Sequence, residues 1–124
     1  MTPEQHRAIA ERIERSLAKC GPADYEMRIE GAMLAGTHWL NASLHASGVT
    51  GSGNDVMHSY LLTVNEYRRL CVAAESLVKA LSEIEDLRPP FVRGNREGGE
   101  AAAQRAVALL AWLRAAGSRA ATHQ

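Results

Sequence analysis

The chain has 124 residues and a mass of 13.5 kDa, which is enough for one domain with its own hydrophobic core. Fourteen basic and fourteen acidic residues give a formal net charge of zero, so the chain lacks the global field that attracts nucleic acid or an anionic membrane. Hydrophobic residues make up 46% of the chain and aromatic residues only 5%, and this alanine-rich composition favours packed helices over a β-sandwich.

The cysteines and the N-terminus indicate the compartment. Cys20 and Cys71 have no CxxC spacing and form no disulfide framework, so we expect reduced thiols half buried in the core. Residues 1–12 lack the apolar core of a signal peptide, and no stretch approaches the roughly 18 uncharged apolar residues of a membrane span. We therefore expect a cytoplasmic protein with no membrane partner.

The first predicted helix covers about residues 3 to 20. It begins with a capping box at Thr2 and proline at the first helical position, and it ends at Gly21 and Pro22. A narrow apolar seam runs along it, formed by Ile9, Ile13 and Leu17. This helix is therefore expected to bury one side.

The second predicted helix begins near residues 22–24, continues to about Ser47, and has two distinctive faces. Its apolar stripe is formed by Tyr25, Ile29, Ala32, Met33, Gly36, Leu40 and Leu44. The opposite row changes from apolar to polar and consists of Met27, Leu34, His38, Asn41 and His45. A helix with such groups on both sides usually lies between layers or under a partner, so we expect this row to be the functional face.

The third predicted helix follows a glycine-rich, mobile linker over residues 48–54. It begins at a cap on Asn54 or Asp55 and continues to Leu87, with a wide apolar face that is expected to make it the central member of the bundle. About 33 residues would span roughly 50 Å, so we expect a kink or an overhang. The segment Arg88-Pro89-Pro90 ends it.

The fourth predicted helix covers about residues 100 to 116 and ends at Gly117, and residues 118–124 are expected to fray. Four helices joined by loops of these lengths favour antiparallel neighbours. The sequence therefore predicts a single all-α domain over residues 1–124, an antiparallel up-down-up-down four-helix bundle.

The histidines are the first candidates for chemistry. His38 and His45 share a helical face with Asn41 between them, but two turns separate them, which is too far to chelate one ion directly. His58 would approach His45 if the two helices packed antiparallel across the linker. The chain lacks the HxxxH or ExxH pairs of metal bundles, so we predict no metal site and no cofactor, and a polar interface in their place.

The arginines near residue 90 are the second candidates. Arg88, Arg93 and Arg96 lie around Pro89-Pro90 and Phe91, a composition that suits a phosphate or carboxylate partner. The favoured interpretation is a helix connector in which Phe91 covers the end of the core, because acidic neighbours cancel the positive field. No GxSxG or P-loop motif is present.

Three segments resemble the HEPN class of small helical bundles. They are the run from Arg28 through His38-Trp39-Leu40-Asn41 to Gly48, then His58-Ser59-Tyr60-Leu61, and then Glu85-Asp86-Leu87-Arg88. The resemblance covers about residues 25 to 115 and implies a helical bundle that dimerises. The nuclease members of that class carry an arginine followed closely by a histidine, a spacing that is absent after Arg88 and Arg93. The resemblance therefore implies an accessory or binding member and not a ribonuclease.

These observations predict a non-catalytic binding or assembly module that forms a homodimer or receives a protein partner, and that does not bind nucleic acid. The dimer interface is expected at Met27, Leu34 and Ala35. Two alternatives stay open. One is an enzyme or metal-binding bundle that uses His38, His45 and His58, and the other is a nucleotide-binding accessory subunit that uses Arg88 and Arg93.

Overall fold

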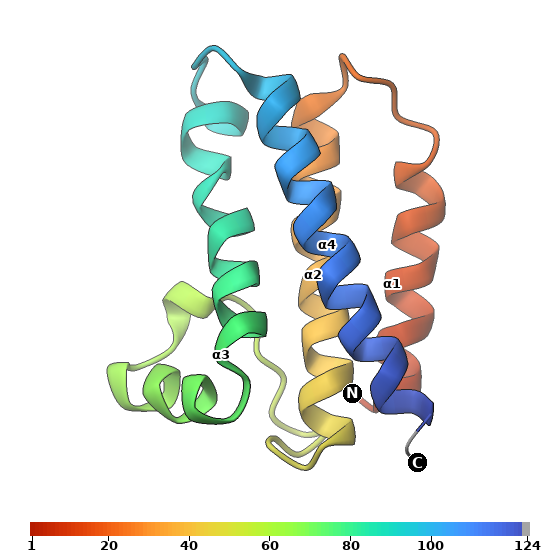
Figure 1. The fold of residues 1–124 in the computed structure, drawn as a ribbon, viewed down its shortest axis with the longest axis vertical. Helices are drawn as coiled ribbons and strands as arrows, with labels where there is room; N and C mark the ends of the chain where they lie inside the picture. The colour runs from red at the N-terminus through yellow and green to blue at the C-terminus, as the bar shows by residue number, and fades with distance from the viewer. Residues whose placement is uncertain (123–124) are drawn as a thin grey trace.

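The computed structural model describes residues 1–122 as helices joined by loops. The elements follow in this order: α1 (Pro3–Leu17), α2 (Tyr25–Ala46), the 3-10 helix η1 (Ser59–Leu61), α3 (Val64–Asp86), the π-helix η2 (Pro89–Arg93) and α4 (Gly99–Thr122). Within these residues there is no β-strand. Successive α-helices run in opposite directions (Figure 1), which confirms the predicted all-α, antiparallel four-helix bundle.

The central pair of the bundle is α2 and α4, and α1 and α3 flank this pair on opposite sides (Figure 1). The prediction that the third helix is central is therefore wrong. Part of its apolar surface stays in solvent, since Val64 is 67% exposed and Val72 is 90% exposed. Figure 1 shows the reason: the first turns of α3 bend away from the bundle axis.

The start of α3 also differs from the prediction. Thr63 caps the helix, and Glu66 completes a capping box with it, whereas Asn54 and Asp55 lie in an extended segment before η1. Asn41 of α2 fixes that segment, because its amide donates to the Val56 carbonyl and accepts from the Val56 N–H, both at 2.7 Å. The expected kink is confirmed at Ala74, whose backbone angles (φ −152°, ψ 48°) are non-helical.

The other helix ends follow local chemistry. The predicted capping box at Thr2 is confirmed, although α1 ends at Leu17, earlier than expected. The third helix ends at Asp86, as the prolines require, and Pro89 opens the π-helix. Phe91 is partly buried against the core, which confirms that it covers this end of the bundle. Cys20 and Cys71 are free and half buried, as expected.

The core lies between α2 and α4. The apolar stripe predicted on α2 is confirmed from its second member onwards, since its first residue, Tyr25, is partly buried and the others are buried: Ile29, Ala32, Met33, Gly36, Leu40 and Leu44. Glycines allow the two helices to approach closely. A Cβ atom on Gly117 would lie 2.6 Å from Cε3 and 3.0 Å from the carbonyl oxygen of Trp39.

Gly117 is therefore a packing residue and does not end the helix. The predicted end of the fourth helix at this position is wrong, because α4 continues to Thr122 through the segment expected to fray. The last two residues of that segment, 123 and 124, lie outside the described residues. None of the helices within residues 1–122 is long and apolar enough to span a bilayer.

Candidate functional site

Three imidazoles and one carboxylate meet where the beginning of α1 faces the end of α2. We call this group the imidazole cluster; it consists of His6, His38, His45 and Asp55. Oδ1 of Asp55 lies 2.9 Å from Nε2 of His6 and 2.7 Å from Nε2 of His45. The second ring nitrogen of His6 lies 2.9 Å from Nδ1 of His38. The cluster therefore joins α1, α2 and the loop that follows α2.

Helix geometry explains how the rings meet. His38 and His45 are seven residues apart, about 10.5 Å along the helix axis, which is too far for direct contact. His6 comes from α1 and lies between them, with ring centroids 5.1 Å from His38 and 5.3 Å from His45. Asp55 arrives from the loop and is held beside Val56, which Asn41 fixes by two hydrogen bonds.

The surroundings of the cluster lower the pKa of two of its histidines, His6 and His38, and of its carboxylate, Asp55. Burial lowers the pKa of His6 and outweighs the opposing effect of Asp55, and burial together with His6 lowers the pKa of His38. Burial opposes the charge of Asp55, but hydrogen bonds from His45 and His6 outweigh it and lower the pKa of Asp55 to about 2. An ionised Asp55 therefore faces a neutral His6 ring at neutral pH.

Both ring nitrogens of His6 and of His45 have polar partners. Asp55 accepts from the Nε2–H groups of His6 and His45. Nδ1 of the neutral His6 ring then accepts from Nδ1–H of His38, and Nδ1 of His45 lies 2.7 Å from the Thr50 hydroxyl oxygen. The cluster is a hydrogen-bond network that ties the loop to two helices.

The structure brings some of the predicted residues together and adds others. His38, Asn41 and His45 all bond to groups outside α2: His38 contacts His6, Asn41 bonds to Val56, and His45 bonds to Asp55. His6 and Asp55 were missed. His6 had a detectable signal, because it continues the apolar seam of the first helix one turn towards the N-terminus. Asp55 had no such signal, because the sequence of a glycine-rich loop does not predict which of its side chains will pack against α2.

A second polar cluster contains His58. Its Nδ1 lies 2.9 Å from Oε2 of Glu85, so the expected approach of His58 to His45 is wrong. Glu85 is buried and also accepts from the backbone N–H and the hydroxyl of Ser59. Ser82 donates to the Ser59 hydroxyl at 2.7 Å. This cluster anchors η1 on α3, and the Ser59 hydroxyl bonds to Glu85 and not to an imidazole.

The arginine candidates are placed separately. Nε of Arg88 donates to Oε1 of Glu30 at 2.8 Å. Glu30 raises the pKa of the Arg88 guanidinium, and Tyr60 adds a smaller effect in the same direction. Arg88 is half buried and already neutralised, which weakens the nucleotide-binding alternative. Arg93 is exposed at the end of η2.

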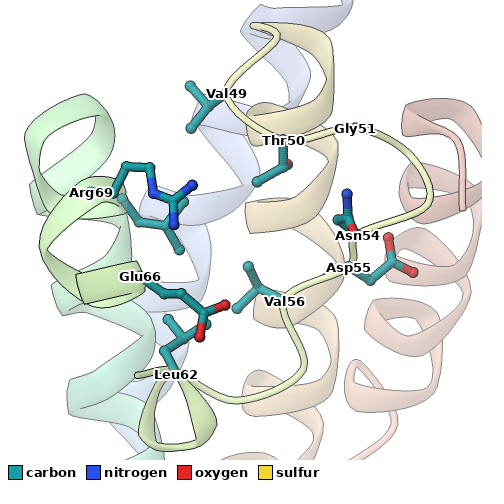
Figure 2. Close-up of a pocket in the computed structure, with 10 residues that line it drawn as sticks. Val49, Thr50, Gly51, Asn54, Asp55, Val56, Leu62, Glu66 and Arg69 are labelled. Carbon is teal, nitrogen blue, oxygen red and sulfur yellow. The ribbon is translucent and has the colours of Figure 1, made fainter. Parts of the chain in front are cut away.

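A cavity of about 440 Å³ lies beside the loop after α2 (Figure 2). Thr50 and Val56 line it from the loop, and Glu66 and Arg69 line it from α3. Figure 2 shows the Asp55 carboxylate pointing away from Glu66 and Arg69, towards α1. Asp55 also lines the cavity, so the cavity and the imidazole cluster meet at this residue, whose carboxylate bonds to the two imidazoles.

Comparisons of this chain with family models, curated proteins and solved structures find no match.

Proposed function

We propose that the protein is a non-catalytic assembly module that forms a homodimer through an exposed face of α2. The observation that carries the proposal is the exposure of two large apolar side chains on a central helix of the bundle. Met27 is 63% exposed and Leu34 is 49% exposed. Large exposed apolar side chains on one helix face are typical of a partner surface.

The α2 face is larger than these two residues. We define it as Met27, Glu30 and Leu34 of α2 with Tyr60 and Arg88. The first three lie at helical positions i, i+3 and i+7, so they share one side of α2. Arg88 bonds to Glu30, and Tyr60 is close enough to affect the pKa of Arg88 and is itself 60% exposed. Methionine, tyrosine and arginine are enriched at protein interfaces.

A second copy of the chain suits this face by charge. In a two-fold dimer the same residues meet themselves, so each copy must supply both signs of charge to avoid repulsion. Glu30 and Arg88 supply one anion and one cation, and both are only partly exposed. The chain as a whole has no net charge that opposes self-association.

One predicted interface residue is removed from the set. Ala35 is fully buried within the chain, so it is not available to a partner. The interface candidates are Met27 and Leu34, as predicted, together with Tyr60 and Arg88. The HEPN resemblance motivates the same proposal, since members of that class typically dimerise.

A pair of matched substitutions tests the proposal. We expect Leu34→Glu to shift the protein from dimer to monomer, because a charge would be buried at the centre of the interface without a partner. Val72→Glu is the control, since Val72 is 90% exposed on α3 and lies outside the α2 face. Size-exclusion chromatography with light scattering, at equal concentration, measures both. A dimer that survives Leu34→Glu, or that dissociates with Val72→Glu, would refute this interface.

A further inference from the structure

We propose that His6, His45 and Asp55 bind one divalent transition metal ion, with Zn²⁺ as the first candidate. One ligand atom from each residue lies within 4.8 Å of the other two. The three residues come from α1, α2 and the loop after α2, which explains why no local motif predicted the site. His45 lies at the end of α2, whereas the proposed dimer face begins at Met27 near its start, and the metal site does not depend on the dimer.

The donor set selects the class of ion. Two imidazole nitrogens and one carboxylate oxygen suit Zn²⁺ and its neighbours among the transition metals. Mg²⁺ and Ca²⁺ prefer shells made of oxygen, so the two imidazoles disfavour them. Three protein ligands leave a fourth tetrahedral position for water or an added ligand.

The second ring nitrogens of both histidines are already in contact with suitable partners. When a metal takes Nε2, the ring proton moves to Nδ1 and needs an acceptor. Nδ1 of His45 lies 2.7 Å from Oγ1 of Thr50 and 3.3 Å from its carbonyl oxygen. Nδ1 of His6 lies 2.9 Å from Nδ1 of His38. The change from the metal-free network to a metal site therefore reassigns protons without turning a ring.

The geometry requires a small displacement. Ligand atoms at about 2.0–2.1 Å from zinc in a tetrahedron are about 3.3 Å apart. The two hydrogen bonds to Asp55 hold Nε2 and Oδ1 at 2.9 Å and 2.7 Å, so each of these pairs must separate by about half an ångström, and the two histidine ligand atoms, now within 4.8 Å of each other, must reach the same spacing. Asp55 lies on a loop and its side chain is 25% exposed, which gives both this freedom and a route for the ion.

His38 has a positioning role in this site. It contacts His6 and not the ion, and its ring nitrogen accepts from the metal-bound form of His6. Removing such a partner typically weakens metal binding by about 10- to 100-fold. The site therefore extends beyond its three ligands, to His38 and Thr50.

Calorimetric titration of untagged, chelator-treated protein with ZnCl₂ tests the proposal. We expect one ion per chain in the wild type, and binding at least about tenfold weaker in His45→Asn and Asp55→Asn. His58→Asn is the control, because His58 belongs to the Glu85 cluster and should leave binding unchanged. Titration with Co²⁺ gives a second readout, since visible absorption bands report tetrahedral coordination and should disappear in the same variants.

A further variant keeps the test valid if the ligand variants fail to fold. Thr50→Val keeps the shape of the side chain but removes the hydroxyl beside His45, so we expect a folded protein with about tenfold weaker Zn²⁺ binding. Absence of stoichiometric Zn²⁺ binding in the wild type would overturn the proposal. Affinity that is unchanged in Thr50→Val and in the folded ligand variants, or that is lost in His58→Asn, would overturn it as well.

Discussion

Nε2 of His6 lies 2.9 Å from Oδ1 of Asp55, although 49 positions separate the two residues along the chain. The contact closes the beginning of α1 onto the loop after α2, at a place where His6 is only 2% exposed. A buried donor that loses its acceptor keeps its full desolvation cost, so this bond matters more than a surface contact.

Asp55→Ala should therefore destabilise the fold at neutral pH by about 1–3 kcal/mol, because it leaves the buried His6 Nε2–H without an acceptor. Urea unfolding in the presence of a chelator measures the difference. Asp86→Ala serves as the control, since Asp86 is an exposed aspartate at the end of α3 and should change stability by less than about 0.5 kcal/mol. Equal unfolding midpoints for wild type and Asp55→Ala would contradict the prediction.

The contribution of Asp55 to the free energy of unfolding depends on pH. The pKa of Asp55 is lowered from 3.8 to about 2, so its contribution is fully present above pH 4 or so and is lost as the pH falls towards about 2. The difference in unfolding free energy between wild type and Asp55→Ala should shrink across this window. A difference that stays constant from pH 6 to pH 2 would contradict the lowered pKa.

The two histidines with a lowered pKa, His6 and His38, affect stability at a higher pH than Asp55 does. In the unfolded chain His6 and His38 titrate near 6.5, whereas in the folded chain their pKa values are lower, so the unfolded chain takes up protons first. Stability should therefore fall as the pH drops below about 6.5. The urea midpoint in chelator should be lower at pH 5.5 than at pH 7.5. His38→Asn should reduce this drop, and an undiminished drop in that variant would contradict the prediction.

Two neighbouring glutamates of α3 give a direct comparison of buried and surface charge. Glu85→Ala removes the acceptor from the backbone and the hydroxyl of the buried Ser59 and should cost about 1–3 kcal/mol. Glu83→Ala removes an exposed ion pair with Arg105 and should cost at most about 1 kcal/mol. Thermal or urea unfolding of the two variants checks the order. Equal costs would show that the Glu85 cluster does not anchor η1.

Gly117→Ala tests the close approach of α4 to α2. Alanine is about 1 kcal/mol more favourable than glycine within a helix. The new methyl group, however, would lie 3.0 Å from the backbone oxygen of Trp39, and such overpacking costs about 1–3 kcal/mol. We expect net destabilisation, whereas Gly51→Ala should be nearly neutral because a Cβ there meets nothing within 4 Å. A stabilised Gly117→Ala protein would refute this packing.

Regular patterns in the sequence predicted regular structure. Period-3.6 spacing from Ile29 to Leu44 predicted the buried stripe of α2, and the capping box at Thr2 predicted the start of α1. Predictions failed where two local signals competed. Asn54 and Thr63 both suit a helix cap, and the hydrogen bonds of Asn41 to Val56 favour the later start. The local position of Gly117 predicts a helix end. Its actual role, close packing against Trp39, depends on how two helices meet and has no local pattern.

The candidate site was predictable only in part, for a related reason. The polar row on α2 follows from spacing along one helix, so His38, Asn41 and His45 could be selected from the sequence. Their partners His6 and Asp55 depend on the packing of α1 and on the path of a glycine-containing loop. Neither the packing of α1 nor the path of the loop has a characteristic residue spacing, so no HxxxH or ExxH pair indicates His6 and Asp55.

The most direct test of the proposed function is the mass of the wild-type protein in solution. Sedimentation equilibrium over a series of micromolar concentrations distinguishes a chain of 13.5 kDa from a dimer of twice that mass. The proposed homodimer predicts a mass that approaches the dimer value as the concentration rises. A single species of 13.5 kDa at every concentration would contradict assembly through the α2 face.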